Sequence, residues 1–246
     1  MLLFGGFSNI GRFNDLWQYD LDTGRWHEIN DAGSVPARRC LHTSAFIESS
    51  GEMLVYGGIQ GGGGRSSDFF DDTHLYNPQS RQWRRLNITG PGKRSGAIAF
   101  YDSAEDAVFL WGGKEFNTLP NSLWRFDVQS ERWSEVATQG DIPIGREDPI
   151  HFWDEAGGSL FMASGADSRA GLILLNDIFR LKLATKTWEK LSFAEAPPSR
   201  WRGTLAFDPV ARKGYLFGGW RDFGGRDALN DLWALDLEQL QWTRLQ

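Results

Sequence analysis

Five copies of one pattern run through this chain, and their regular spacing limits its fold more than any other feature. Each copy has an apolar stretch that ends in small residues, a loop, a stretch of alternating residues, a turn and a closing tryptophan. The closing residues are Trp26, Trp83, Trp133, Trp188 and Trp242, at intervals of 57, 50, 55 and 54 residues. A near-constant period of this length is typical of repeat architectures, in which each copy forms one small structural unit.

The copies consist of short runs with period-two alternation, rich in Trp, Phe, Tyr, Leu and Val and bounded by Gly, Asp, Asn and Pro. This pattern predicts β-strands and turns, and no stretch has convincing helical periodicity. We expect a first strand in four copies, at about 42–48, 95–101, 148–153 and 202–207. We expect a second, third and fourth strand in all five copies, at about 1–6, 14–20 and 25–29; 52–58, 72–77 and 82–87; 107–113, 121–127 and 131–136; 158–165, 176–182 and 186–191; and 213–219, 230–236 and 240–245.

Side-chain size predicts how these strands are arranged. The first strands contain small residues such as Ala45 and Ala97, which suit strands that converge on an axis where Cβ atoms crowd. The third strands carry large rings two residues apart, such as Trp124 and Phe126, on one face of the pleat, where they can pack sheet against sheet. Four short strands per unit, packed face to face around an axis, describe a β-propeller. We therefore expect an all-β single domain, residues 1–246, built as five four-stranded blades with repeats at about 1–30, 36–87, 91–136, 143–191 and 197–245.

The order of motifs resembles a known family. A strand, Gly218-Gly219, Asn230-Asp231-Leu232-Trp233, an aromatic-x-Asp turn and a closing tryptophan are similar to the kelch repeat, which also builds the central domain of galactose oxidase. The resemblance covers residues 2–245 and implies a kelch β-propeller. The departures are local: Ser164-Gly165 replaces the glycine pair, Lys182 replaces the turn aspartate, and His74 replaces a packing aromatic.

One blade is expected to lack its innermost strand, because the first strand occurs four times and the others five times. Kelch propellers usually combine strands from both ends of the chain in one blade, which the resemblance leads us to look for here. Three interpretations are open: a ring with one three-stranded blade, a fragment of a larger propeller, or a blade completed by another chain. We favour the first, although an uncovered strand edge is a template for a further strand.

The loops at the two ends of the strands differ in charge. Turns between first and second strands are acidic, with Glu48, Asp106 and Glu155 among them. Loops that enter the first strands, and the long loops between second and third strands, are instead rich in Pro, Gly, Arg and aromatic residues, the side chains enriched at binding hot spots. The candidate binding residues on this side are Arg38, Arg39, Phe70, Arg94, Phe116, Arg146, Arg200, Trp201, Arg202, Trp220 and Arg221. Gly61 to Arg65 and Phe223 belong to the same long loops.

We expect a kelch-type protein–protein interaction module, without catalysis of its own, that captures an acidic segment of a partner on this face. Arginine can grip a carboxylate with two parallel hydrogen bonds. The alternative for any one arginine is a structural role, in which it bonds to loop carbonyls or stacks on a ring. The alternative for the whole chain is a kelch-fold enzyme, epimerase- or oxidase-like, that acts on an anionic small molecule or carbohydrate.

Composition argues against several other classes of partner and indicates where the protein is located. The formal net charge of −6 does not favour binding to nucleic acid or to an anionic membrane surface. Cys40 is the only cysteine, which excludes an internal disulfide and fits a reducing compartment. No apolar run approaches the ~20 residues that span a bilayer. The first residues also lack the features of a signal peptide, so we expect a cytoplasmic protein.

No constellation of residues predicts a cofactor, a metal site or catalytic residues. His42 and His151 with Glu147 or Asp148 are the nearest approach to a metal site, but the two histidines fall two repeats apart. Copper chemistry like that of galactose oxidase needs a cysteine close to a tyrosine. Here Cys40 lies in a loop, and the tyrosines fall at packing positions of strands.

Overall fold

The structure is a computed structural model that describes residues 1–30, 32–62, 64–222 and 224–246. Gly63 and Phe223, both in loops singled out above, lie outside the described residues. The described chain is all-β with one short 3-10 helix, η1 (Ser66–Asp68), and its five main sheets have the arrangement of a five-bladed β-propeller, as predicted. It divides into two compact units. The first comprises residues 1–110, 114–116 and 124–135, and the second residues 111–113, 117–123 and 136–246.

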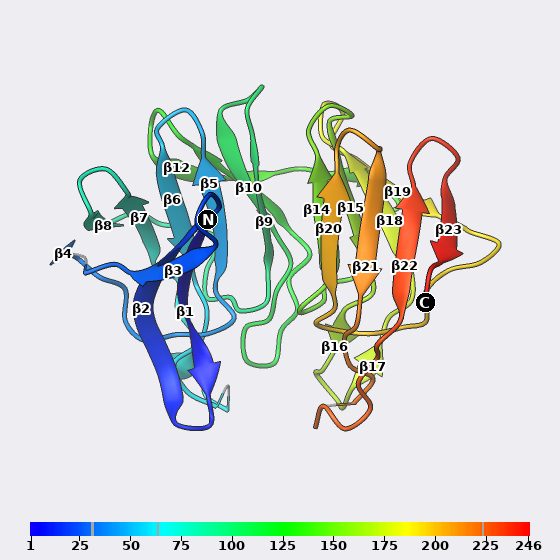
Figure 1. Ribbon diagram of the computed structural model, residues 1–246, viewed down its shortest axis with the longest axis horizontal. Helices are drawn as coiled ribbons and strands as arrows, with labels where there is room; N and C mark the ends of the chain where they lie inside the picture. The colour runs from blue at the N-terminus through cyan, green and yellow to red at the C-terminus, as the bar shows by residue number, and fades with distance from the viewer. Residues whose placement is uncertain (31, 63, 223) are drawn as a thin grey trace. The chain divides into compact units, whose positions relative to one another are not determined.

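The first unit contains three sheets (Figure 1). The first sheet has the order β1 (Leu2–Ser8), β2 (Gly11–Asp20), β3 (Arg25–Glu28). The second has the order β4 (Ala32–Gly33), β8 (Gln82–Leu86), β7 (Thr73–Asn77), β6 (Glu52–Tyr56), β5 (Thr43–Ile47). The third, whose residues fall mostly in this unit, has the order β12 (Arg132–Val136), β11 (Leu123–Asp127), β10 (Ala107–Trp111), β9 (Ile98–Asp102).

The second unit contains two main sheets and a hairpin. One sheet has the order β13 (Gln139–Gly140), β19 (Thr187–Leu191), β18 (Ile178–Lys182), β15 (Ser159–Ala163), β14 (Ile150–Asp154). The other has the order β20 (Thr204–Asp208), β21 (Lys213–Phe217), β22 (Leu232–Asp236), β23 (Gln241–Arg244). The hairpin pairs β16 (Ala166–Asp167) with β17 (Ile173–Leu174).

The predicted strands are confirmed to within a few residues, and the first sheet has the three strands predicted for it. Within each unit, first strands of consecutive copies pack together. In the first unit, Ala45 and Ile47 of β5 share a core with Ala99 of β9. In the second, the rings of Phe152 in β14 and Phe207 in β20 stack 4.8 Å apart. Small or flat side chains on these strands therefore allow neighbouring sheets to approach closely.

Closing tryptophans of the second and third copies join their sheets to the sheet before. Trp83 of β8 packs against Phe4 of the first sheet, with ring centroids 4.9 Å apart. Trp133 of β12 meets Tyr56 of β6 at 5.3 Å and donates its Nε1 hydrogen to the hydroxyl of Thr73 at 3.0 Å. Buried rings of this size supply much of the energy that holds sheets together. This packing explains the closing tryptophan of those two copies.

Two short parallel strands, which the sequence pattern did not predict, cover the outer edges of β8 and β19. They are β4, with Gly33 opposite Trp83, and β13, with Gly140 opposite Trp188. A Cβ atom added at Gly33 would lie 2.2 Å from the Trp83 carbonyl oxygen, and Gly33 also has φ +86°, so glycine is required there. The added strands protect two sheet edges from pairing with other chains.

The expectation of a long loop between the second and third strands was wrong for the first copy. There β1 and β2 continue as a regular hairpin through Phe7 opposite Arg12 and Ser8 opposite Gly11 (Figure 1). An irregularity between Phe4 and Gly6 lets the ladder resume after the glycine pair. In the fourth copy the long loop is partly ordered as the β16–β17 hairpin. No helix in the described part of the chain is long and apolar enough to cross a membrane.

Candidate functional site

Three arginines at the entrances to first strands are structural. Arg39, Arg146 and Arg200 are fully buried, and each makes the same bonds in its own sheet. The Nε hydrogen goes to the carbonyl two residues back, and Nη1 donates to the carbonyl just after the second strand, at Gly57, Ser164 or Gly218. The two terminal nitrogens also grip a carboxylate at the start of the third strand, from Asp72, Asp177 or Asp231.

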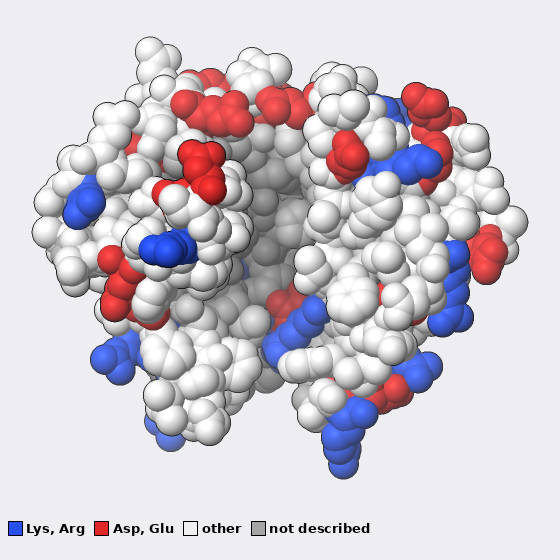
Figure 2. Space-filling view, in the orientation of Figure 1, with Lys and Arg blue, Asp and Glu red and all other residues white. Residues whose placement is uncertain are grey.

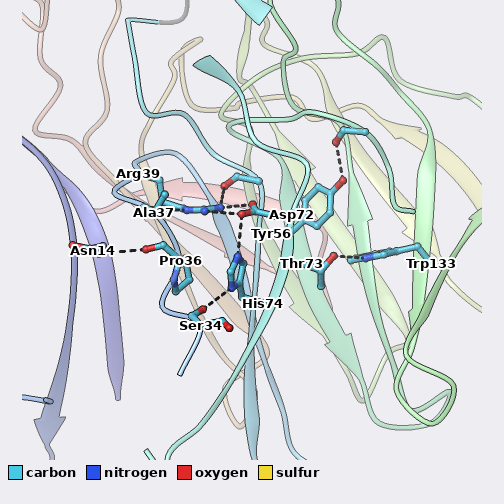
Figure 3. Close-up of polar contacts among 12 residues, drawn as sticks. Asn14, Ser34, Pro36, Ala37, Arg39, Tyr56, Asp72, Thr73, His74 and Trp133 are labelled. Carbon is cyan, nitrogen blue, oxygen red and sulfur yellow. Dashed lines mark hydrogen bonds and ion pairs between the residues drawn. The ribbon is translucent and has the colours of Figure 1, made fainter. Parts of the chain in front are cut away.

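Arg39 shows the arrangement in detail (Figure 3). Its Nη1 and Nη2 lie 2.6 and 2.9 Å from the two carboxylate oxygens of Asp72, and its Cζ lies 4.0 Å above the centroid of the Phe70 ring. His74 Nε2 lies 3.0 Å from the same carboxylate, and His74 Nδ1 lies 3.1 Å from the Ser34 carbonyl oxygen. Burial by itself would raise the pKa of Asp72. The hydrogen bonds from Arg39 and His74 outweigh it and hold that pKa below its ordinary value.

The expectation that these arginines present their charge to a partner therefore needs correction. In Arg39, Arg146 and Arg200 the donors already face protein acceptors, and Phe70 is the ring on which Arg39 lies. Arg94 is also buried, and its Nε and Nη2 donate to the Pro91 carbonyl at 3.0 and 2.8 Å. All four arginines therefore have the structural role given above as the alternative, because a guanidinium without water around it needs internal acceptors.

The sequence contains a signal that would have identified these pairs. The aspartate follows its arginine by 33 residues in the second copy and by 31 in the fourth and fifth. In the third copy, Ser122 stands at the aspartate position. A carboxylate that recurs at a nearly fixed distance from an arginine, once per repeat, indicates an ion pair within the repeat rather than two exposed charges.

The remaining candidates lie at or near the surface. Arg38 and Phe116 are exposed in the first unit, and Phe116 has φ +45°, a strained conformation for a residue with a side chain. Arg202, Trp220 and Arg221 are half-buried or exposed in the second unit, where Trp201 is buried beneath them. The prediction that all entry loops face one channel concerns both units and stays a prediction.

The second unit brings three of the predicted residues together with an aspartate, and we call Asp148, Trp201, Arg202 and Trp220 the Arg202 platform. Trp201 and Trp220 exchange two backbone hydrogen bonds of 3.1 and 2.9 Å, which join the entry loop to the loop after β21. The Arg202 Cζ lies 4.3 Å from the Trp201 ring centroid and 5.8 Å from that of Trp220. A cation in this position is attracted to both ring faces.

The orientation of Arg202 is set from one side only. Its Nε donates to Asp148 Oδ2 at 2.7 Å, whereas its two terminal nitrogens have no hydrogen bond to any described residue. The side chain of Arg202 is 26% exposed to solvent, and that of Asp148 is 10% exposed. Both residues have positive φ, +56° and +48°, which costs energy in each case and holds the two side chains in this geometry. The platform therefore presents two N–H-bearing nitrogens to solvent in a fixed plane.

The loop beside the platform is held together by its own ion pairs. Arg221 Nη2 lies 2.9 Å from Asp227 Oδ1, and Arg226 Nε lies 3.3 Å from Asp222 Oδ2. The Asp222 carbonyl accepts the Trp201 indole hydrogen at 3.2 Å. Arg221 is thus exposed at the edge of the platform, but it forms an ion pair with Asp227.

The acidic turns are structural as well as charged. Figure 2 shows Asp and Glu side chains gathered at the end of the first unit where the β5–β6 and β9–β10 turns lie. Asp102 accepts a hydrogen bond from the Glu105 amide, and Asp208 accepts from two amides in the β20–β21 turn. Aspartate is therefore needed to form these turns.

A pocket of about 450 Å³ opens in the first unit beside Asp72 and His74, with Asp71 and Arg85 also in its lining. The carboxylate of Asp72 is already bonded to Arg39, and the ring of His74 to Asp72 and Ser34, so the protein itself holds both groups. Nowhere in the described ranges do three His, Cys, Asp or Glu side chains lie close enough together to hold a metal ion.

Comparison with known proteins agrees with the fold. A family model of the KLHDC2/KLHL20/DRC7 Kelch-repeats domain matches residues 1–103 and 97–246. The chain is 29% identical to the leucine-zipper-like transcriptional regulator 1 homolog of Drosophila melanogaster, over all of this chain and 25% of that protein. It is 27% identical to Kelch domain-containing protein 10 of Xenopus tropicalis, over 95% of this chain and 56% of that protein. It is 30% identical to Kelch domain-containing protein 3 of Bos taurus, over 66% of this chain and 44% of that protein.

The chain thus spans from a quarter to about half of the length of these curated relatives. The family model covers both units, and the sheets carry the strand order that the repeat predicts. This chain belongs to the kelch-repeat family.

Proposed function

We propose that this chain is a protein-interaction module and that the Arg202 platform binds a carboxylate in an acidic segment of a partner protein. Kelch domains generally bind protein partners, and several relatives that match the chain are described as kelch domain-containing proteins. The observation that supports the proposal most directly is the pair of terminal nitrogens of Arg202, which have no hydrogen bond to any described residue.

The platform has the chemistry that a carboxylate requires. Two parallel N–H groups of a guanidinium match the two oxygens of a carboxylate and give both charge and direction. The rings of Trp201 and Trp220 hold the guanidinium plane and exclude water from one side of it. Asp148 occupies the Nε side, so an incoming carboxylate has one edge of Arg202 left to bind. Tryptophan and arginine together are the residues that most often dominate binding at protein interfaces.

The test is a screen of a random 12-residue peptide library, displayed on phage, against three forms of the chain. The wild type and Lys190→Glu should enrich peptides that contain Asp or Glu. Arg202→Glu should bind the same peptides at least about tenfold more weakly, because a repulsive charge replaces the bidentate contact. Lys190→Glu is the matched control, since it makes the same charge change at an exposed side chain of β19, outside the platform.

Two results would contradict the proposal. One is enrichment of peptides without acidic residues by the wild type. The other is equal affinity of Arg202→Glu and Lys190→Glu for the enriched peptides. Circular dichroism spectra of all three forms would show that a loss of binding does not come from unfolding.

A further inference from the structure

The two short parallel strands belong to segments that the backbone holds in the same way. We call residues 32–34 the first strap, which contains β4 and covers β8, and residues 139–141 the second strap, which contains β13 and covers β19. In each strap the last residue donates its amide hydrogen to the carbonyl of the closing tryptophan at 2.9 Å, from Ser34 to Trp83 and from Asp141 to Trp188. The two straps therefore differ mainly in the side chains around them.

His74 occupies in the second copy the position that Phe179 has in the fourth. The His74 ring lies 6.4 Å from the ring of Trp83 at an angle of 79°, and the Phe179 ring lies 6.4 Å from that of Trp188 at 90°. Histidine thus keeps the packing of the ring and adds two nitrogen atoms. One of them, Nδ1, lies 3.1 Å from the carbonyl oxygen of Ser34 in the first strap. Phenylalanine cannot make such a bond to the second strap.

Both nitrogens of His74 face hydrogen-bond acceptors. The Ser34 carbonyl oxygen has no hydrogen to give, and Asp72 Oδ2 lies 3.0 Å from Nε2. Burial by itself would raise the pKa of Asp72, but the hydrogen bonds from Arg39 and His74 hold it below its ordinary value, so this carboxylate is ionised. A neutral imidazole has one N–H group and one lone pair, so it can donate to only one of these oxygens.

The imidazolium form of His74 satisfies both contacts, because it has an N–H group on each nitrogen. The His74 side chain is only 4% exposed, so water does not replace a bond that the neutral ring cannot make. A buried lone pair that faces a carbonyl oxygen is unfavourable. The closed first strap therefore favours the protonated ring.

Charges of both signs surround this ring. Asp72 is bonded to it and also to Arg39, which reaches the same carboxylate from the entry loop. On β8, Arg85 lies opposite His74 in the strand pairing and has an exposed side chain. Asp71 and Arg85 line the pocket of about 450 Å³ beside the ring. The two arginines oppose a further positive charge and the two aspartates favour it, so the contacts with Asp72 and Ser34 decide where the proton is held.

We propose that His74 is a pH-sensitive latch, whose protonated ring ties the first strap to Asp72 and whose deprotonation loosens the strap from β8. The sign follows from proton binding: the closed strap holds the second proton, so the strap is closed at low pH and opens more often as the pH rises through the titration of the ring. Opening uncovers the outer edge of β8 and moves Ser34, one wall of the pocket, away from it. The latch lies in the first unit, and this inference does not depend on the Arg202 platform.

The test is amide hydrogen exchange, followed by NMR on the wild type at pH 5.5 and pH 8. These values bracket the titration of an ordinary imidazole, at about pH 6.5. Rates are expressed relative to those of an unstructured chain, which removes the direct effect of pH on exchange. Protection of the Ser34 amide should fall at least about tenfold at pH 8, the effect of one lost hydrogen bond to a charged group. The second strap is the internal control, and protection of the Asp141 amide should change less than about twofold.

Two variants make the test specific. His74→Phe copies the fourth copy, so protection of the Ser34 amide should be the same at both pH values, whatever its level. His27→Gln removes an exposed histidine of the first sheet and should keep the wild-type response. The ring of His74 in the wild type gives a readout that needs no variant. NMR of its nitrogens should show a hydrogen on both at pH 5.5, and one hydrogen should be lost over the pH range in which the Ser34 amide loses protection.

Three results would overturn the proposal. One is protection of the Ser34 amide that does not depend on pH in the wild type. Another is an equal fall of protection at Ser34 in the wild type and in His74→Phe, or at Ser34 and Asp141 in the wild type. The third is a His74 ring that carries a single hydrogen at pH 5.5 while the Ser34 amide is protected.

Discussion

At the scale of single residues, the buried Arg–Asp pairs dominate the entry loops. A guanidinium with no exposure is stable only if internal acceptors replace water, and here two carbonyls and one carboxylate do so in each of three sheets. The pair connects the start of the first strand to the start of the third, so it fixes how the loop enters the sheet. Removing one partner leaves the other charge buried.

We expect Asp231→Ala to destabilise the fold by about 3–5 kcal/mol, the usual cost of leaving a buried charge without its partner. Asp227→Ala is the matched control. Asp227 is 50% exposed and pairs with an exposed Arg221, so its loss should cost about 0.5 kcal/mol or less. Urea unfolding followed by tryptophan fluorescence measures both. Equal unfolding midpoints for the two variants would show that the buried ion pair contributes no more stability than the exposed one.

His42 makes stability depend on pH. Burial, and then the charge of Arg39, lower its pKa to about 4, and its Nδ1 is buried without a hydrogen-bond partner in the described chain. In the unfolded chain the same ring titrates at about 6.5. Between these values the unfolded state binds the proton and the folded state does not. Stability from this group is therefore complete above pH 6.5 and falls as the pH drops toward 4.

The expected loss over that range is about 3 kcal/mol, from the size of the pKa shift. His42→Phe keeps a ring to pack against Phe4 but cannot be protonated, so its stability should change much less between pH 6.5 and 4. The exposed His27→Gln should retain the wild-type dependence. Chemical denaturation at a series of pH values measures the free energy of unfolding of each variant. If His42→Phe lost as much stability as the wild type between pH 6.5 and 4, the assignment to His42 would be contradicted.

At the scale of elements, the turns repeat as faithfully as the strands. In four copies, the turn before the fourth strand begins with Asp or Asn, whose side chain accepts a hydrogen bond from the amide three residues on. In three of them it also accepts from the amide two residues on, as Asp20 does from Asp22. The turn ends in a residue with positive φ, which is glycine only in the first copy. These residues are Gly24, Arg81, Glu131, Lys186 and Leu240.

We expect Gly24→Ala to destabilise the fold by about 1 kcal/mol, because φ is +65° there and the new Cβ would meet only the Tyr19 hydroxyl at an ordinary 3.6 Å. Leu240→Gly should stabilise it by about 0.5–1 kcal/mol, since φ is +50° and the side chain is 39% exposed. Unfolding midpoints in urea test both changes. Shifts in the same direction would mean that side-chain contacts, not the backbone, decide these positions.

The sequence predicted the elements well and the arginine roles poorly. Strand positions follow from alternation and turn residues within about ten residues of chain, which is why the predicted runs match β5 to β12 and β18 to β23. Whether Arg200 faces solvent or Asp231 depends on a partner 31 residues away. Alternation within a strand carries no information on such a contact. The short strands β4 and β13 were missed for the same reason, since each pairs with a strand far along the chain.

At the scale of the whole molecule, many charged side chains stabilise the fold. The net charge of −6 comes from 32 acidic and 26 basic side chains, and many of the acids cap turns or hold buried arginines. Net charge is therefore a poor guide to which surface binds a partner. The Arg202 platform is instead a place where a local pattern of hydrogen bonds is left incomplete, at the terminal nitrogens of Arg202.

The amino-acid sequence alone determined the repeat, the all-β class and the four-strand unit, because each depends on residues close together in the chain. Only the tertiary structure decided which arginines are buried and which rings hold Arg202. Those outcomes depend on how segments about 30 or more residues apart pack together. Burial then determines whether a charge meets a carboxylate of its own chain or remains available to another.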